Sequence, residues 1–404
     1  MNVNKKNTPN YLKILNKKKI MRYIAEHDKK SRTDIAQALM ISKPTVSLIV
    51  DELINEEWIF EKESHEASVH GGRKPIHLYL NPIARYMIGI DIGGTNIEIG
   101  LLNIKGDVIQ VNVLDTQSLL REGMMDKICE CVFDLLRKNH IEKEKVLAIG
   151  VGAPGITDTN QGIVLEAPSL GWVNYPLKQE IHKRVDIPVY VDNDVNVAIL
   201  GEQWKGKARH ANHAILITLG TGIGCGIIVN GELYRGHHYA AGEIGYLITD
   251  KNKMKSGTIQ TFDGYGFLDS QVGGYSIVKK MEELLLQRGQ GHPLKGKKLT
   301  AKMVFEQAMK GEDDSLRIID EALDHLAFAL VNVISILNPQ CVVLAGGLSK
   351  SGHWFLPKVQ AVLDKYLPLQ TKVVLTELEH ISIIGTGALC LSEHESLLKH
   401  ERMV

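Results

Sequence analysis

The sequence predicts an α/β protein built from an N-terminal winged helix-turn-helix domain, residues 1–80, and a larger two-lobed α/β domain, residues 81–404. Three observations predict this fold class. The first 80 residues carry three helical patterns followed by two strand patterns. Beyond Asn81-Pro82 the pattern changes to strands that alternate with helices. An opening of strand, glycine turn and strand occurs twice, at residues 86 and 214, which predicts two related lobes at about 81–200 and 201–404.

Apolar spacing and capping residues define the elements of the N-terminal domain. Ser31 precedes a short helix, and Ser42 is a good N-cap for the next helix, with Pro44 in the first turn. The predicted elements are helices over 11–27, 33–39 and 43–56, then strands over 58–62 and 76–80. This order of helix, helix-turn-helix and two-stranded wing is typical of DNA-binding domains.

The elements of the larger domain follow from buried-strand patterns and glycine turns. Strands are predicted at 86–91, 97–103, 146–151, 214–219, 226–230 and 341–344. Helices are predicted at 124–138, 301–310, 314–337 and 352–366, and a last helix is expected to start near Gly385 and run towards Lys399.

Composition narrows the class of protein. With 44% hydrophobic and 23% charged residues, the chain has the composition of a globular protein. No apolar run approaches the roughly 20 residues that a membrane-spanning helix needs, and the polar N-terminus has no secretory pattern. Five cysteines in 404 residues make no disulfide framework, so we expect a cytoplasmic protein.

The net charge of zero hides an asymmetry. Residues 1–80 carry 14 basic against 10 acidic side chains, and the remainder carries 33 against 37. A basic end on an otherwise acidic chain indicates a polyanionic partner. A solvated, frayed N-terminus explains the charge alone equally well.

The helix-turn-helix pattern predicts contacts with double-stranded DNA. Recognition helices use their N-terminal residues in the major groove, and a wing reaches the minor groove or backbone. We expect the acidic residues at 51, 52, 56 and 57 to point away from the groove. The predicted DNA contacts are Ser42, Lys43, Pro44, Thr45 and Ser47 on the second helix and Arg73 and Lys74 in the wing. The alternative is a helical hairpin with a charged surface.

Three glycine turns are candidate phosphate-binding sites. Each follows a predicted strand, and glycine lets backbone N–H groups face an anion. None of them is a Walker A loop or a dinucleotide-binding loop. Taken alone, each turn is also explained as a tight hairpin. The predicted nucleotide or phosphate contacts are Asp91, Gly93, Gly94 and Thr95 in the first turn, Thr221 and Gly222 in the second, and Gly346 and Gly347 in the third.

Together the three turns resemble the acetate-kinase and actin-like ATPase fold, which is also that of sugar kinases, and the chain is most similar to the ROK family of repressors and kinases. The stretch from Leu219 to Gly245 fits the family signature except at its last position. The winged helix-turn-helix ahead of it is similar to the xylose-repressor and N-acetylglucosamine-repressor branch. In ROK kinases an Asn-Asp pair binds the sugar and its Asp is the general base, and the resemblance gives these roles to Asn193 and Asp194. The resemblance also makes Glu243 a sugar ligand.

The chain departs from the family pattern at three expected sugar contacts. Tyr246 stands where the family has His, Asp269 where it has Glu, and Ser169 where it has Asn. Most members also carry a zinc loop with several cysteines, but residues 257–269 contain none, so we expect no zinc and no other metal site. The pair Cys129 and Cys131 lies in a helical pattern and is expected to pack in a core.

The resemblance predicts a DNA-binding regulator, a repressor of carbohydrate-utilisation genes, in which a sugar in the ROK cleft modulates operator binding. The alternative is an active ATP-dependent sugar kinase that also binds DNA, in which case Asp194 is catalytic. A third hypothesis, a regulator that responds to a protein partner, has no feature in its favour. We expect a homodimer or a dimer of dimers, no membrane partner, and no requirement for ATP or Mg²⁺.

Overall fold

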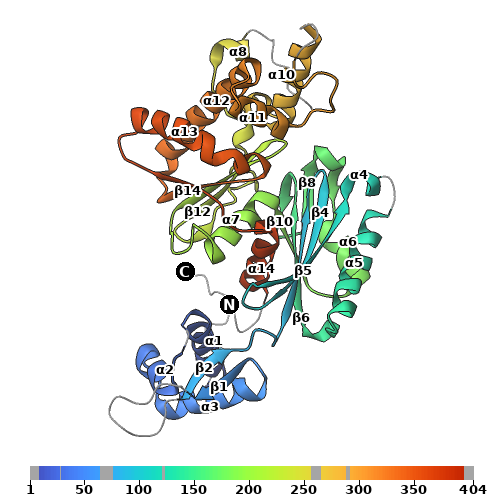
Figure 1. The fold of residues 1–404 in the computed structure, drawn as a ribbon. Helices are drawn as coiled ribbons and strands as arrows, with labels where there is room; N and C mark the ends of the chain where they lie inside the picture. The colour runs from blue at the N-terminus through green and yellow to red at the C-terminus, as the bar shows by residue number, and fades with distance from the viewer. Residues whose placement is uncertain are drawn as a thin grey trace.

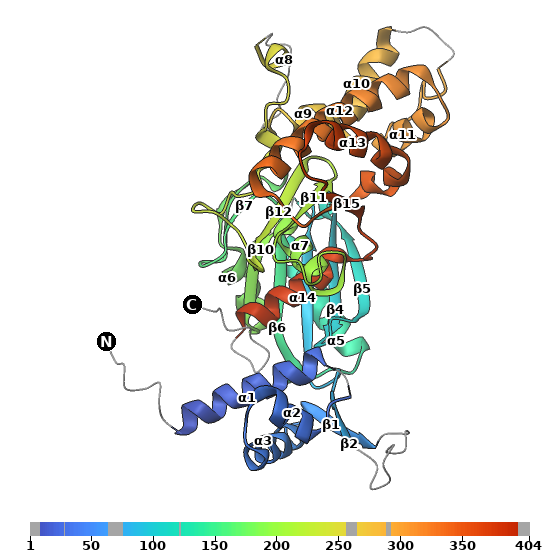
Figure 2. The ribbon, with the colours of Figure 1, turned by 90° about the vertical axis from the view of Figure 1, so that its left-hand side faces the viewer.

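The protein has three bodies in a row. The computed structural model describes residues 9–27, 29–63, 76–120, 123–255, 265–287 and 292–394. The N-terminal domain lies at one end, the first lobe is in the middle, and the second lobe forms the other end (Figure 1 and Figure 2). Among the described residues, every helix is too short or too polar to span a bilayer.

The N-terminal domain is the predicted winged helix-turn-helix. Its elements are α1 (Pro9–Glu26), α2 (Arg32–Leu39), α3 (Lys43–Asn55), β1 (Ile59–Glu63) and β2 (Ile76–Leu80). Ser31 and Asp34 cap α2 reciprocally, and the Ser42 side chain accepts the Thr45 N–H at the start of α3, as local sequence preferences require. The antiparallel pairing of β1 with β2 forms the wing. The turn between the strands, residues 64–75, lies outside the described residues.

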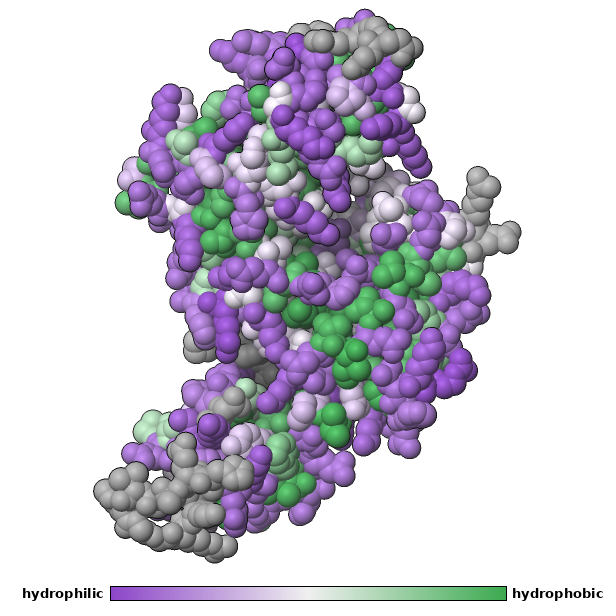
Figure 3. All heavy atoms as spheres, in the orientation of Figure 1, coloured by the Kyte–Doolittle hydropathy of each residue, from purple (hydrophilic) through white to green (hydrophobic). Residues whose placement is uncertain are grey.

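The first lobe is a five-stranded sheet in the order β10-β6-β3-β4-β5. Its strands are β3 (Tyr86–Ile92), β4 (Asn96–Asn103), β5 (Val108–Asp115), β6 (Val146–Ala153) and β10 (Val189–Asn193). Helices α4 (Thr116–Leu119), α5 (Met124–Lys138) and α6 (Leu177–Val185) belong to it, as does a small sheet of β7 (Ile156–Asp158), β8 (Ile163–Ala167) and β9 (Trp172–Tyr175). Apolar side chains gather on the surface near the edge strand β5, where Ile109 and Val113 are exposed (Figure 3).

The second lobe repeats this topology, which confirms the prediction of two related lobes. Its sheet has the order β13-β12-β11-β14-β15, in which three antiparallel strands are again followed by two parallel ones. The strands are β11 (Ala214–Leu219), β12 (Ile223–Val229), β13 (Glu232–Leu233), β14 (Cys341–Ala345) and β15 (Lys372–Leu375). The helices are α8 (Lys251–Lys255), α9 (Asp269–Val272), α10 (Gly274–Gln287), α11 (Ala301–Met309), α12 (Asp313–Leu337) and α13 (Gly352–Tyr366).

Two helices, α7 (Asp194–Lys205) and α14 (Ile381–Glu393), join the lobes. α7 packs on the second sheet through Ala198 and Ile199, and α14 packs on the first sheet through Ile383 and Cys390. The two helices touch at their backbones, because a Cβ on Gly385 would lie 1.6 Å from the Val197 carbonyl oxygen. α14 therefore packs on the first lobe and contacts α7.

Two predicted boundaries were wrong, and glycines explain both. The last helix begins at Ile381 rather than near Gly385, because Gly385 is the contact point with α7 inside the helix. β12 begins at Ile223 rather than at 226, because the glycines after the turn are strand residues against which side chains of α7 pack. In both places the glycine lies inside the element, where close packing requires it.

The far end of α14 reaches the N-terminal domain. The core of that domain includes Ile104 from the hairpin after β4, and Leu147 and Leu391 pack against it from β6 and α14. Tyr190 and His394 are joined by a hydrogen bond of 3.2 Å beside this contact. One helix thus touches α7, the first sheet and the DNA-binding domain.

Candidate functional site

The candidate cleft site forms at the carboxyl ends of parallel strands. β3, β6 and β10 are parallel, so Asp91 at the end of β3 and Asp194 just after β10 come to the same edge of the sheet. Gly152 of β6 lies between them: a Cβ there would be 3.3 Å from Asp91 Oδ1 and 3.3 Å from the Asp194 Cα. Asp91, the acid of the first predicted phosphate turn, and Asp194, the predicted base, therefore lie close together.

Asp91 and Asp194 are poised to change protonation near neutral pH. Burial raises the pKa of each carboxyl to about 7. The charge of Asp194 adds to the shift at Asp91, and the charge of Glu243 adds to the shift at Asp194. Hydrogen bonds from Ser382 of α14 to Asp91 and from the Val195 N–H to Asp194 offset only part of it.

Asn193 caps α7 and fixes the direction of Asp194. Its Oδ1 accepts the N–H groups of Val195 at 2.9 Å and Asn196 at 3.1 Å, and its Nδ2 donates to the Gly155 carbonyl at 2.9 Å. The side chain is thus bonded through both ends to the backbone. Its predicted role as a sugar ligand stays a prediction, while its role in orienting α7 is visible in the geometry.

Glu243 enters the site from the second lobe on a sharp turn. The preceding Gly242 has φ 93° and packs so closely on β12 that a Cβ would lie 1.8 Å from the Cys225 carbonyl oxygen. Burial raises the pKa of Glu243, and the charge of Asp269 adds to the shift. Asp194, Glu243 and Asp269 therefore form one group of mutually repelling carboxyls.

Asp269 braces the second glycine turn. Its Oδ1 accepts the Ile223 N–H at 2.7 Å and its Oδ2 accepts the Gly266 N–H at 2.9 Å. Burial raises its pKa, and these two bonds oppose the shift. The carboxylate thus holds the start of β12 and the segment before α9 together, and direct contact of Asp269 with a sugar stays a prediction.

Tyr246 belongs to the second lobe and Ser169 to the first. Tyr246 is exposed, and burial together with the charges of Glu243, Asp269 and the first-lobe Glu166 raises its pKa. Ser169 is exposed beside the first glycine turn, where a Cβ on Gly94 would be 3.6 Å from its own Cβ. The three altered family positions thus remain near the site.

The first glycine turn differs in detail from the predicted anion site. The Gly93 N–H donates to the Asn96 carbonyl at 2.9 Å, so it closes the turn and does not face an anion. Thr116 and Gln117 bond to the Gly93 and Gly94 carbonyls at 2.8 Å. Thr95 is exposed.

The other two turns meet at the edge of the second sheet. Thr221, Gly346 and Gly347 are exposed there, and Gly222 is partly exposed beside the Asp269 carboxylate. Gly346, with φ 90°, lies against Leu219 at the end of β11. Phosphate binding at the three turns stays a prediction.

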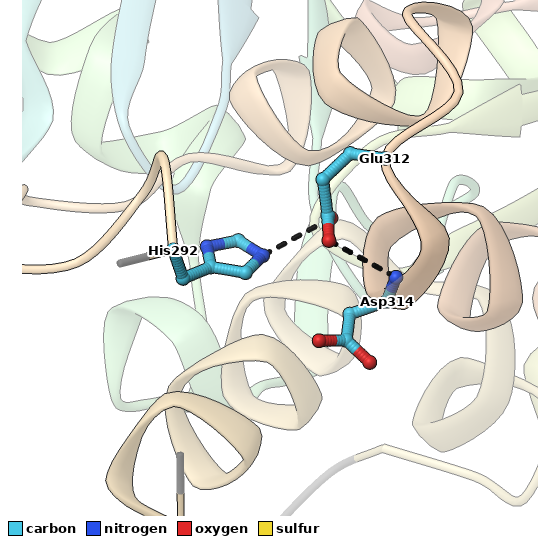
Figure 4. A group of neighbouring side chains, drawn as sticks. All are labelled: His292, Glu312 and Asp314. Carbon is cyan, nitrogen blue, oxygen red and sulfur yellow. Dashed lines mark hydrogen bonds and ion pairs between the residues drawn. The ribbon is translucent and has the colours of Figure 1, made fainter. Parts of the chain in front are cut away.

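One group of side chains in the described part of the chain has metal-ligand chemistry: His292, Glu312 and Asp314 (Figure 4). Its hydrogen bonds fit a helix cap. The Glu312 carboxylate accepts the N–H groups of Asp314 and Ser315 at the start of α12. Burial alone would raise the pKa of Glu312, but the hydrogen bonds outweigh it and lower the pKa to about 2. The Leu294 N–H donates to His292 Nδ1, so the ring proton lies on Nε2, 3.0 Å from Glu312 Oε2. A metal on Nε2 would need the opposite tautomer.

Of the segment in place of the family's zinc loop, 257–269, residues 257–264 lie outside the described residues. Cys129 and Cys131 are buried in α5, in the core of the first lobe, as expected.

The predicted DNA contacts on α3 are tied to one another or to α2. The Ser42 and Thr45 hydroxyls lie 2.7 Å apart as part of the cap. Ser47 Oγ accepts a hydrogen bond of 2.9 Å from Arg32. Lys43 and Pro44 are exposed at the first turn of the helix. The predicted wing contacts Arg73 and Lys74 lie outside the described residues.

The acidic residues of α3 were expected to point away from the outer face of the helix. One of them does not. Val46, Ile49, Val50 and Leu53 are buried, and the exposed residues opposite them, at spacings of four, three and four, are Pro44, Leu48, Asp51 and Asn55. Asp51 is thus on the outer face, where Arg32 pairs with it at 2.7 Å. Arg32 and Leu48 were not among the predicted contacts, although the helical spacing alone places Leu48 opposite the buried stripe.

The comparisons with known proteins agree with both parts of the molecule. Residues 87–390 match the ROK family, and residues 15–59 match a winged helix-turn-helix DNA-binding model. The chain is 30% identical over 362 residues to the xylose repressor of Caldicellulosiruptor bescii, covering 88% of each chain. It is 32% identical to the glucokinase of Halalkalibacterium halodurans, over 70% of this chain and 86% of the kinase.

A solved structure shares the whole arrangement. It is a ROK family transcriptional regulator described as a homologue of the E. coli MLC protein, with TM-score 0.77 and 22% identity, covering 94% of this chain and 96% of that one. The kinase relative spans a smaller share of this chain, whereas the repressor and the regulator cover it nearly end to end. The chain is a member of the ROK family that carries an N-terminal winged helix-turn-helix domain.

Proposed function

We propose that this protein is a sugar-responsive DNA-binding repressor. The observation that carries the proposal is the position of α14, which contacts the cleft carboxyl Asp91 through Ser382 and the core of the winged helix-turn-helix domain through Leu391. Sugar phosphorylation does not require a helix that contacts both the cleft and the DNA-binding domain, whereas regulation of DNA binding by a sugar does.

The cleft is suited to a neutral, polyhydroxylated ligand. Carboxyls are strong acceptors for hydroxyl groups, and a carboxyl with a pKa near 7 can also donate when protonated. Asp194, Glu243 and Asp269 offer several such groups in one place. The names of the relatives, xylose repressors and glucokinases, point to an aldose, and we take D-xylose and D-glucose as the first ligands to test.

The sugar acts on DNA binding by favouring one arrangement of the lobes. α7 starts at Asp194 and α14 starts beside Asp91, so a ligand held between the lobes changes the contact between these two helices. α14 has 13 residues, roughly 20 Å of rigid helix, and its far end lies on the DNA-binding domain. A sugar that binds the two arrangements unequally shifts their populations.

The proposed partner is operator DNA, bound by a homodimer in the cytoplasm. Two copies of the recognition helix contact two half-sites, which gives the affinity that one small domain lacks. The proposed effector needs no ATP, Mg²⁺ or zinc.

Fluorescence anisotropy tests the proposal directly. The operator is selected from a random duplex library with the wild-type chain and then titrated with and without each sugar. We expect one sugar to change operator affinity about tenfold and Glu243→Gln to abolish that response. Leu391→Ala should bind both sugar and operator as the wild type does but respond less. An operator affinity that neither sugar changes would contradict the proposal, as would selection of no sequence.

The second candidate function is an ATP-dependent sugar kinase. It is favoured by the placement of Asp194, whose pKa of about 7 suits a general base, at a cleft that also has three glycine turns. It predicts ADP release from ATP in the presence of D-glucose or D-xylose, abolished in Asp194→Asn. ADP release with no effect of sugar on DNA binding would favour this function over the repressor.

A further inference from the structure

The recognition helix presents an apolar side chain where bases are read. α3 lies at the end of the molecule that faces away from both lobes (Figure 1 and Figure 2). On its outer face Leu48 is 58% exposed, in the second turn from the N-terminus. Recognition helices enter the major groove with these first turns, so Leu48 is among the side chains that come nearest to the bases.

The polar side chains around Leu48 are already bonded within the domain. Arg32 donates to Ser47 Oγ at 2.9 Å, pairs with Asp51 at 2.7 Å, and reaches Glu61 of the wing at 2.9 Å. The guanidinium therefore links α2, α3 and β1. It neutralises two carboxylates that would otherwise repel the phosphates, and it holds the face on which Leu48 stands.

The Ser42 and Thr45 hydroxyls, 2.7 Å apart, bond to each other at the N-terminal cap of the helix. On the outer face, the first two turns thus offer Pro44 and Leu48, neither of which has a side-chain donor or acceptor. An apolar side chain in the major groove has one specific partner among the four bases, the C5-methyl group of thymine.

We propose that Leu48 is a specificity-determining residue that recognises a thymine methyl group in each half-site, and that Arg32 positions it. The proposal rests on the proposed DNA-binding function and adds the base and the atom that are recognised. Since Leu48 is mostly exposed in the free protein, truncating it should leave folding unchanged.

Replacing thymine by uracil tests the contact, because uracil pairs identically and lacks only the methyl group. Each thymine of the selected operator is changed in turn, and binding is measured by anisotropy for the wild type and for Leu48→Ala. We expect one position per half-site at which uracil weakens wild-type binding about fourfold, the value for one buried methyl group. At that position Leu48→Ala should bind thymine and uracil equally.

Ile83→Ala is the matched control, since Ile83 is an aliphatic residue of the same exposure, 59%, after the wing. It should keep the wild-type response to uracil. A second selection with Leu48→Asn should shift the preferred base from thymine to adenine, which an amide recognises. Equal responses of the wild type and Leu48→Ala at every thymine would overturn the inference while operator binding still supports the proposed function. Failure to select any sequence would overturn both.

Discussion

The recognition helix and the cleft treat their carboxylates in opposite ways. Asp51 of α3 pairs with Arg32, and Glu56, the residue just after the helix, pairs with Lys17 at 2.6 Å. In the cleft, Asp91 and Asp194 face other acids, and within the described part of the chain no ion pair joins them to a basic side chain.

The difference follows from the two partners. A surface that meets phosphates must have its negative charge neutralised beforehand. A cleft that binds a neutral sugar can hold its acids close together, because protonation near pH 7 relieves their repulsion. The same residue type is thus used for two tasks, and its neighbours determine which.

The largest effect should come from Asp192, the cleft-edge acid that has a partner. It is 1% exposed, and Arg235 of the second lobe reaches it with Nε at 2.8 Å and Nη2 at 2.7 Å. Arg235→Ala leaves a buried charge unpaired and should lower the free energy of unfolding by about 3–5 kcal/mol. Chemical denaturation at pH 7.5 measures the loss. The double variant Arg235→Met, Asp192→Leu should recover most of it, and a single variant as stable as the wild type would show that the pair is not closed in solution.

Neutralising an unpaired acid of the cleft should stabilise the protein, in contrast to removing the partner of Asp192. The folded-state pKa of Asp194 is about 7, above its ordinary value of 3.8, so it costs no stability below pH 4, and the cost grows as pH rises to 7. Asp194→Asn should therefore raise the free energy of unfolding by up to about 4 kcal/mol at pH 8 and by almost nothing at pH 4, given roughly 1.4 kcal/mol per pKa unit.

Denaturation at both pH values, with Asp51→Asn as the control for a paired acid, measures this effect. A pH-independent difference would show that the acid does not titrate in the folded cleft.

The parts of the fold that local sequence patterns determine were predictable, and the parts that long-range packing determines were not. The winged domain was predicted well because caps and apolar spacing are local signals, and Ser31, Ser42 and the buried face of α3 appear as expected. The duplicated lobes were predictable from the strand and glycine-turn repeat. The contact of Gly385 with α7 was not, because long-range packing, which has no local signal, requires that glycine.

Family resemblance located the site residues, but it could not predict which side chains surround them. Asp91 and Asp194 are 103 positions apart in sequence, and only strand order brings them together. The Arg32 clamp joins three elements and has no signature at any one of them.

Arg32→Ala tests whether neutralisation on α3 serves DNA binding. Without the guanidinium, Asp51 faces the phosphates as an unpaired charge, and we expect operator affinity to fall about tenfold, or roughly 1.4 kcal/mol. Adding Asp51→Asn to the same chain should restore most of the affinity. Anisotropy at fixed salt measures both, and a double variant no better than Arg32→Ala would assign the loss to something other than charge.

Lys43→Ala should have the smallest effect. Lys43 is exposed at the first turn of α3, where a phosphate contact is expected. Its removal should weaken binding two- to threefold on every sequence, by a rough estimate, and reduce the slope of log affinity against log salt by about 1. Titrations at four salt concentrations measure the slope, and an unchanged slope would place Lys43 away from the phosphates.

In the proposed mechanism the cleft and the recognition helix are energetically linked, and calorimetry measures this linkage. The affinity of the active sugar is measured for the free protein and for the protein saturated with operator. Linkage requires the two sugar affinities to differ by the same factor as the operator affinities with and without sugar, about tenfold here. Equal sugar affinities in the two states would contradict the account, because a ligand with no preference between the states cannot regulate DNA binding.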